Sequence, residues 1–197
     1  MPSLFDADQL TVRAQTNSEL TRSRDYDLLD PAGAVLGSAT QDTGSVVSLA
    51  RRQVARSRAA TPADFSVRDA SGALLARVSK RVTGVLRRQL RTEVRLADGL
   101  VVAVASASVG GGRFAVRQPS GALIAEMGRA GRTLLAVTGP HRERYGTVDL
   151  EANTRSARRA GTAQPNSYLV RFDPAAPLAA RIATLAVVVV FDSLRGV

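Results

Sequence analysis

Apolar and polar residues alternate along most of the chain, and this period of two is the pattern of β-strands with one buried face. Turn signals such as Asp98-Gly99 separate the alternating segments, which favours an antiparallel meander of neighbouring strands. No composition shift marks a domain linker, and the polar, basic stretch 152–166 is interpreted as a mobile hairpin loop. The predicted strands are 9–15, 25–30, 34–41, 64–69, 73–79, 92–97, 100–108, 113–118, 122–127, 133–138, 144–150 and 167–172.

An internal repeat supports this interpretation, because three segments share an aromatic residue that is followed seven positions later by glycine. In each copy, alternating residues lead into a short turn, and the glycine stands where positive φ is needed before the alternation resumes. Each copy is therefore predicted to be a β-hairpin. The three segments read FSVRDASGALLA from Phe65, FAVRQPSGALIA from Phe114 and YDLLDPAGAVLG from Tyr26.

The pattern changes near the C-terminus, where Asp173 can cap a helix and Pro174 suits its first turn. Alanines favour a helix over about 175–194, although the valines at 187–190 prefer strands. This helix is apolar on nearly every side and shorter than a membrane span, so protein must enclose it. The sequence predicts a mainly β fold and one domain over 1–197, in which about twelve antiparallel strands form a closed barrel around the helix.

The net charge indicates a polyanion as a candidate partner. The chain has 27 basic and 17 acidic residues, which give a formal net charge of +10. Such a charge raises the local concentration of the protein near polyanions such as nucleic acid or an anionic membrane. The absence of cysteine excludes disulfides and thiolate metal sites, and a single histidine, His141, excludes a zinc site built on several imidazoles. The N-terminal segment lacks a secretory signal, so we expect the protein in the cytoplasm, peripheral at the inner face of the plasma membrane.

Two clusters of basic residues are the candidate binding sites for anionic lipid headgroups. In the first cluster, Val47, Ala50 and Val54 fall at helical spacing, which predicts a short segment with one apolar edge and a cationic remainder. A solvated face opposite the core accounts for the same charges and stays open as an alternative. The first cluster is Arg51, Arg52, Arg56 and Arg58, and the second is Lys80, Arg81, Arg87, Arg88 and Arg91.

Other functions find less support in the residues. Nucleic-acid binding requires exposed aromatic side chains for stacking or a recognition helix, and the sequence shows neither. A barrel that uses its basic surface to bind nucleic acid or another protein remains the alternative. The sequence Gly110-Gly111-Gly112-Arg113 lacks the lysine of a phosphate loop, and His141 stands in a turn-like setting, so no enzyme activity, catalytic residue, cofactor or metal is predicted.

Three motifs in order along the chain carry a family resemblance. They are Leu4-Phe5-Asp6-Ala7-Asp8-Gln9-Leu10, Tyr26-Asp27-Leu28-Leu29-Asp30 with Gly33, and Asn166-Ser167-Tyr168-Leu169-Val170 before Pro177-Leu178 and an apolar helix with Asp192. With them the whole chain resembles the phospholipid scramblase family and its plant LURP-one relatives. The resemblance implies the tubby-like fold, a twelve-stranded barrel around a central hydrophobic helix. It also implies membrane association and movement of phospholipids between leaflets.

The chain departs from animal scramblases in the features linked to calcium and lipid anchoring. It has no proline-rich N-terminal extension, no palmitoylated cysteine cluster, and one carboxylate, Asp173, where those proteins carry an acidic calcium-binding segment. Asp25, Asp27 and Asp30 lack the glycine and distal glutamate of a calcium loop. We therefore expect a non-catalytic, calcium-independent protein that binds anionic phospholipid surfaces and takes part in phospholipid scrambling.

Overall fold

The computed structural model describes residues 4–15, 25–42, 62–83, 89–108, 113–131, 133–149 and 167–194. Within them, a short 3-10 helix is followed by twelve strands and one α-helix. These elements are η1 (Leu4–Asp6), β1 (Gln9–Ala14), β2 (Asp25–Leu29), β3 (Val35–Gln41), β4 (Ala63–Asp69), β5 (Leu74–Thr83), β6 (Gln89–Leu96), β7 (Val101–Ser108), β8 (Arg113–Arg117), β9 (Leu123–Arg129), β10 (Leu134–Thr138), β11 (Arg144–Asp149), β12 (Ser167–Phe172) and α3 (Leu178–Leu194).

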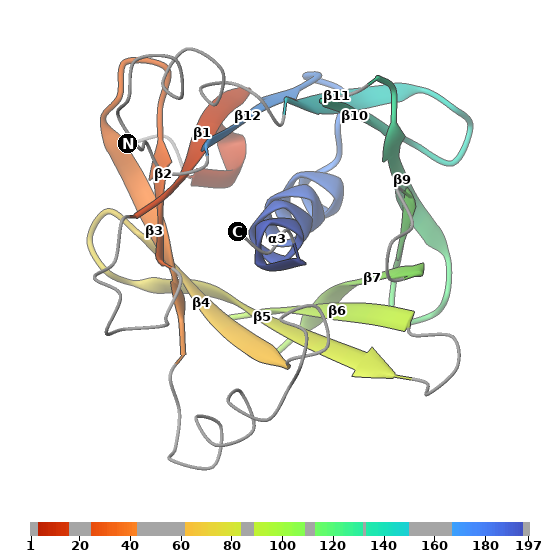
Figure 1. The fold of residues 1–197 in the computed structure, drawn as a ribbon, viewed down its shortest axis with the longest axis horizontal. Coiled ribbons are helices and arrows are strands. Elements are labelled where there is room, and N and C mark those ends of the chain that lie inside the picture. The colour runs from red at the N-terminus through yellow and green to blue at the C-terminus, as the bar shows by residue number, and fades with distance from the viewer. Residues whose placement is uncertain are drawn as a thin grey trace.

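Each strand pairs antiparallel with its neighbours in the sequence, and β1 pairs with β12 to close the sheet into a barrel. Figure 1 looks into this barrel and shows α3 running through its middle. The predicted mainly β fold is confirmed, and so is the C-terminal helix inside a closed antiparallel barrel. Closure also removes the unpaired sheet edges that an open meander of this length would expose.

The two ends of the barrel differ in their connections. Tight turns join β2 to β3, β4 to β5, β6 to β7, β8 to β9 and β10 to β11, and all five lie at one end, here called the tight-turn end. The opposite end is called the loop end. There the described strands stop at the boundaries of 16–24, 43–61, 84–88, 109–112 and 150–166, which lie outside the described residues.

The five tight turns share one hydrogen-bond pattern. The first turn residue donates its N–H to the carbonyl four positions on, and the fourth residue donates back to the carbonyl of the first. This closure requires a left-handed backbone at the fourth position, which glycine adopts without steric cost. Glycine occupies that position in the three repeats identified by sequence and in the turn between β6 and β7. The values of φ are 87° at Gly33, 85° at Gly72, 91° at Gly99 and 93° at Gly121.

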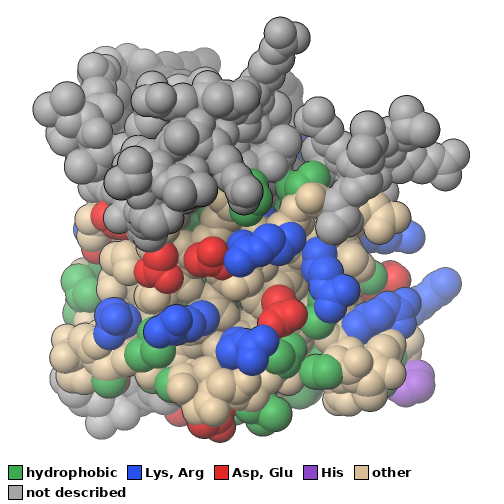
Figure 2. All heavy atoms as spheres, turned by 90° about the horizontal axis from the view of Figure 1, so that it is seen from below, with side chains coloured by type: hydrophobic (Ala, Val, Ile, Leu, Met, Phe, Trp, Pro, Cys, Tyr) green, Lys and Arg blue, Asp and Glu red, His purple; other side chains and the backbone are tan. Residues whose placement is uncertain are grey.

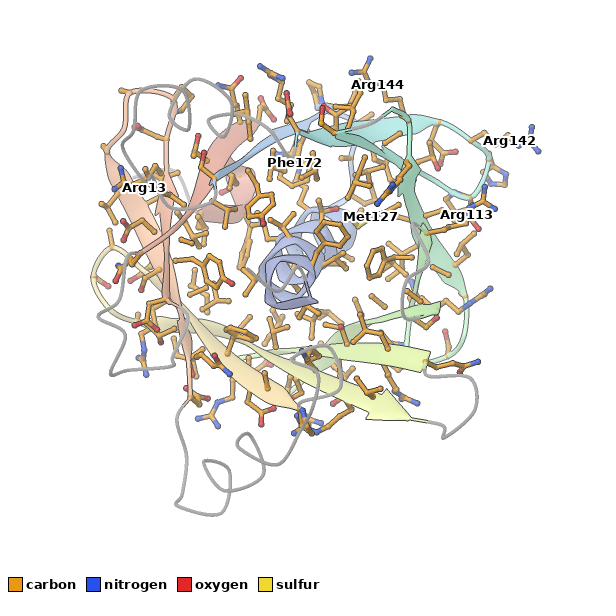
Figure 3. All side chains as sticks on the ribbon, viewed as in Figure 1. Arg13, Arg113, Met127, Arg142, Arg144 and Phe172 are labelled. Carbon is orange, nitrogen blue, oxygen red and sulfur yellow. The ribbon has the colours of Figure 1, made fainter. Side chains whose placement is uncertain are left out.

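The helix fills the barrel with apolar side chains. From Ala180 to Phe191 every residue is buried, as are the inward residues of the strands. Met127 and Phe172 point toward the helix in Figure 3. The Tyr26 hydroxyl donates to the Val189 carbonyl over 3.4 Å, which ties β2 to the helix. In the described part of the chain, no helix has both the length and the apolar character needed to span a membrane.

Arg181 closes the tight-turn end beneath the helix. Its guanidinium donates to the carbonyls of Asp6, Ala7, Asp173 and Ala176 and lies 5.3 Å from the centre of the Phe172 ring. It also pairs with the Asp8 carboxylate at 2.9 Å. These contacts join η1, β12 and the start of α3.

The helix begins three residues later than the sequence predicts. The Asp173 side chain accepts from the N–H of Ala175, and its carbonyl accepts from Ala176, so Asp173 caps a separate turn instead of the helix. Pro177 then precedes the first helical residue, Leu178.

Candidate anion-binding surface

Four arginines stand on the outer face of two neighbouring strands. In β5 the residues Ala76, Val78 and Lys80 face inward, which turns Arg77 and Arg81 outward. The same alternation turns Arg91 and Arg95 outward on β6. We call Arg77, Arg81, Arg91 and Arg95 the arginine block.

Register brings the members of the arginine block directly opposite one another. Arg81 faces Arg91 and Arg77 faces Arg95 across the two strands. Side chains opposite one another in an antiparallel pair have Cβ atoms about 5 Å apart, and like charges in that position destabilise the sheet. Two such pairs on one wall therefore concentrate positive charge where folding alone would disfavour it.

Acidic side chains neutralise half of this charge. Glu93 lies between Arg91 and Arg95 on β6 and pairs with Arg95 at 2.7 Å. Asp64 of β4 pairs with Arg81 at 2.9 Å. Arg77 and Arg91 have no acidic partner among the described residues. Both ion pairs are solvent-exposed, where such contacts contribute about 0–1 kcal/mol, so Arg81 and Arg95 can exchange their partners for an external anion at little cost.

Further arginines extend the basic wall beyond β5 and β6. Arg68 on β4 and Arg117 on β8 are exposed, and each donates to the carbonyl of its turn glycine, as Arg95 does. These bonds hold each guanidinium at the tight-turn end of its hairpin. Figure 2 shows the face below the barrel of Figure 1, where Lys and Arg side chains form a band with fewer acidic side chains between them.

The structure corrects the prediction that Lys80 belongs to the headgroup-binding site. It is 1% exposed and lies on the inward face of β5, opposite Ala63 and Thr92. Its ammonium group is therefore enclosed by the barrel and does not belong to the outer basic surface. The alternation itself contained this information, because Lys80 is two residues from the apolar Val78 and so shares its face.

The structure brings together only part of the predicted set. Arg81 and Arg91 are neighbours on the outer wall, four residues or fewer from the connection between β5 and β6 at the loop end. The predicted helical segment around 47–54 and the predicted hairpin loop at 152–166 lie outside the described residues. So do Arg51, Arg52, Arg56, Arg58, Arg87 and Arg88.

Sequence reasoning missed Arg77 and Arg95, since it searched for arginines that cluster along the chain. The signal that identifies them is the alternation with Ala76, Val78 and Val94, which places both arginines on the outer face. Their direct opposition depends on the register of β5 against β6.

The acidic residues considered for calcium have local structural partners. Asp27 pairs with Arg13 at 3.0 Å, Asp30 accepts from the Ala34 N–H, and Asp25 accepts from the Gln41 N–H. In the described residues no three His, Cys, Asp or Glu side chains gather in a way that could hold a metal ion.

His141 lies in the exposed turn between β10 and β11, as its sequence setting predicts. Its backbone N–H donates to Glu143. The same carboxylate accepts from the Tyr145 hydroxyl, which lowers the pKa of Glu143 and raises the pKa of Tyr145. These contacts stabilise the turn, and the glycines at 110–112 lie outside the described residues.

Comparison with known proteins adds no relative to this picture: no family model, no curated protein and no solved structure matches the chain.

Proposed function

We propose that this protein is a peripheral membrane protein, similar to scramblases, that binds anionic phospholipid headgroups on its outer wall without calcium and without catalysis. The observation that carries the proposal is the arginine block, with its two directly opposed arginine pairs. A phosphate or carboxylate between two guanidiniums accepts hydrogen bonds from both and removes their repulsion. The arrangement is therefore more favourable in the presence of an anion than in its absence.

The strength of such binding follows from the number of exposed cations. Each arginine near an anionic membrane surface contributes about 1 kcal/mol, so Arg77 and Arg91 together contribute about 2 kcal/mol. That is roughly a thirtyfold change in membrane partition. Because the arginines are exposed, salt should screen the attraction over about a Debye length and release the protein.

The distribution of charge along the sequence supports an approach in which the outer wall of β5 and β6 lies along the membrane and the loop end tilts toward it. The residues outside the described ranges include 13 of the 27 basic residues and 2 of the 17 acidic residues. The strand and helix ends that precede these charged segments lie at the loop end. A molecule with its excess charge toward one end is oriented by an anionic surface as well as attracted to it.

The buried helix favours membrane contact through the exterior of the barrel. The apolar side chains of α3 already pack against the barrel interior. Releasing the helix would expose that interior, at a cost of about 25 cal/mol for each Å² of apolar surface. Headgroup binding by the outer wall needs no such rearrangement. The part of the proposal that concerns scrambling rests on the family resemblance and is tested separately, by translocation of a labelled lipid with and without calcium.

Vesicle flotation tests the proposal with a matched pair of variants. Arg77→Ser/Arg91→Ser removes two unpaired charges from the arginine block, whereas Arg144→Ser/Arg171→Ser removes two exposed charges from β11 and β12 on the opposite wall. The first variant should bind phosphatidylserine-containing vesicles about thirtyfold more weakly, and its melting temperature should be no lower than that of the wild type, because each substitution also relieves one pair of opposed arginines. The control variant should lose much less. Equal losses in the two variants, or wild-type binding to pure phosphatidylcholine vesicles at high salt, would contradict the proposal.

Replacing the first arginine cluster tests the orientation. Serine at positions 51, 52, 56 and 58 should lower binding to the same anionic vesicles and leave the melting temperature unchanged. Unchanged binding would remove this cluster from the proposed surface.

The location of the aromatic residues argues against single-stranded nucleic acid as the ligand. Proteins that bind single strands stack bases on exposed aromatic side chains. All three tyrosines and all five phenylalanines of this chain are buried, and the chain has no tryptophan. An oligonucleotide that binds as tightly as anionic vesicles, with the same dependence on the arginine block, would favour the nucleic-acid alternative instead.

A further inference from the structure

The turn between β10 and β11 breaks the rule that the other four tight turns follow. It has the same two backbone hydrogen bonds, from Gly139 to the Glu143 carbonyl and from Arg142 to the Gly139 carbonyl. Its left-handed position, with φ of 64°, is occupied by Arg142 instead of glycine. Arginine is disfavoured in this conformation because its Cβ approaches the backbone. Such strain persists where surrounding contacts enforce it, and it concentrates at functional sites.

The surrounding contacts here are specific. The Glu143 carboxylate folds back over the turn, where it accepts from the His141 N–H at 2.8 Å and from the Tyr145 hydroxyl at 2.7 Å. A Cβ at Gly139 would overlap both the Glu143 carboxylate and the Tyr145 ring, so a larger residue there would displace the carboxylate that closes the turn. The turn is therefore held in place by these contacts, and its one carboxylate is engaged by His141 and Tyr145.

This arrangement leaves two cations exposed. Arg142 and Arg144 point away from the barrel in Figure 3, and neither forms an ion pair with any described residue. Pro140 is exposed beside them. The turn thus presents two guanidiniums on a fixed backbone.

An exposed apolar segment lies next to this turn. The N–H of Asp173 donates to the Tyr145 carbonyl at 2.9 Å, which sets the connection between β12 and α3 beside the start of β11. Arg181 fixes the connection from within by donating to the carbonyls of Asp173 and Ala176. Pro174 and Pro177 are exposed, and Leu178 is 53% exposed although it begins an otherwise buried helix. We call Pro140, Arg142, Arg144, Pro174, Pro177 and Leu178 the connector surface.

We infer that the connector surface docks a segment of a protein partner that carries carboxylates beside apolar side chains. The carboxylates bind Arg142 and Arg144, and the apolar side chains cover Pro174, Pro177 and Leu178. Both halves of the surface are rigid before binding, so little conformational entropy is lost on association. Arginine beside an exposed apolar centre is also the composition of protein interfaces. This docking is independent of the arginine block, which lies on another wall.

Charge at the tight-turn end favours a narrow protein segment over an anionic bilayer. The other turns at this end carry the exposed or half-exposed carboxylates of Asp30, Asp69 and Asp98. A flat anionic surface laid across the end would meet these groups and be repelled. An extended peptide about 10 Å wide covers about two neighbouring strands, so it can lie along β11 and the connection after β12 without crossing the turns that carry Asp30, Asp69 and Asp98.

Arg142→Gly tests the inference without damaging the fold. Glycine relieves the left-handed strain, so the variant should melt a few °C higher than the wild type. The probe is a peptide of alternating Glu and Leu, and its counterpart of alternating Gln and Leu is the control. In an amide NMR titration of the full chain, the Glu peptide should shift residues 139–145 and 173–179. It should bind the wild type about fivefold more tightly than Arg142→Gly, which is the scale of one exposed ion pair.

Every outcome of the titration decides the inference. Arg77→Ser should bind the Glu peptide like the wild type, and Arg142→Gly should float with anionic vesicles like the wild type. A failure of the docking inference can therefore be distinguished from a failure of the proposed vesicle binding. Equal affinity of Arg142→Gly and wild type for the Glu peptide would overturn the inference. So would equal affinity of the two peptides, shifts confined to the arginine block, or anionic vesicles that shift the connector surface as the peptide does.

Discussion

Replacement of Arg181 by methionine tests how the barrel holds its helix. The arginine is 7% exposed and joins three parts of the chain that are distant in sequence. Methionine keeps much of the side-chain volume and its contact with Phe172, but it cannot donate hydrogen bonds. At the tight-turn end of the barrel, four carbonyls then lose their hydrogen-bond donor, those of Asp6, Ala7, Asp173 and Ala176.

The magnitude follows from how each contact is solvated. Asp8 is 64% exposed, so its ion pair with Arg181 contributes less than about 1 kcal/mol. A hydrogen bond from a charged donor contributes about 1.5–3 kcal/mol, and the four carbonyl bonds, at 3.2–3.3 Å, are long enough to fall at the lower end. Because the four share one donor group and are not additive, we expect a loss of about 3–5 kcal/mol. That is a large fraction of the 5–15 kcal/mol that stabilises a typical domain.

Urea denaturation followed by circular dichroism measures this loss. With an m-value of about 2 kcal/mol per molar, the midpoint of Arg181→Met should fall by about 1.5–2.5 M. Asp8→Asn is the matched control, because it removes the ion pair and keeps the carbonyl bonds, and its midpoint should fall by no more than about 0.5 M. Equal losses in the two variants would refute the assignment of the stability to the carbonyl bonds, and a negligible loss in Arg181→Met would refute the closure itself.

Four further substitutions probe the helix, the interior and the strained turn. Ala186→Asp places an unpaired charge against the barrel wall and should prevent folding, whereas Leu178→Asp at the exposed start of the same helix should fold; both are read by circular dichroism. Thr92→Val should raise stability by about 1 kcal/mol in urea, because the buried Thr92 hydroxyl has no hydrogen-bond partner among the described residues. The Tyr145 bond lowers the pKa of Glu143 from 4.5, so the stability it adds is complete above pH 4.5 and is lost as pH falls through the lowered value. The same bond raises the pKa of Tyr145 from 10.0, so stability is lost again as pH rises through the raised value. In urea midpoints measured against pH, Tyr145→Phe should abolish the loss at high pH and reduce the loss at low pH, where the backbone bonds to Glu143 remain.

The fold was predictable because local signals agree with the global arrangement. The repeats that begin at Phe65 and Phe114 specify hairpins by alternation and a turn glycine, and each forms as predicted. A helix with no polar face requires an enclosure, and a meander of short strands supplies one by closing. The start of the helix was misplaced because Asp173 and Pro174 can begin either a helix or a turn, and the choice depends on the carbonyl that Arg181 binds 8 residues away.

The candidate site was less predictable because it depends on register and on contacts between distant residues. Proximity along the chain grouped Lys80 with Arg81, whereas alternation places them on opposite faces of β5. The bond from Arg181 to Asp8 spans 173 residues and has no local signal. No local signal marks Arg142 either. A left-handed position is recognised in a sequence by its glycine, and this turn has arginine in place of glycine there.

The relation between the helix and the bilayer is tested most directly by a tryptophan at position 191. The chain has no other tryptophan, and Phe191 is buried against the Phe114 ring, with centroids 6.1 Å apart. The Phe191→Trp variant is bound to phosphatidylserine vesicles whose acyl chains carry bromine, a contact quencher, and binding is verified by flotation in the same sample. The account predicts binding without quenching, because the charged wall meets the headgroups while the helix stays inside the barrel. Quenching of the bound protein would show that the helix enters the bilayer and would contradict the account.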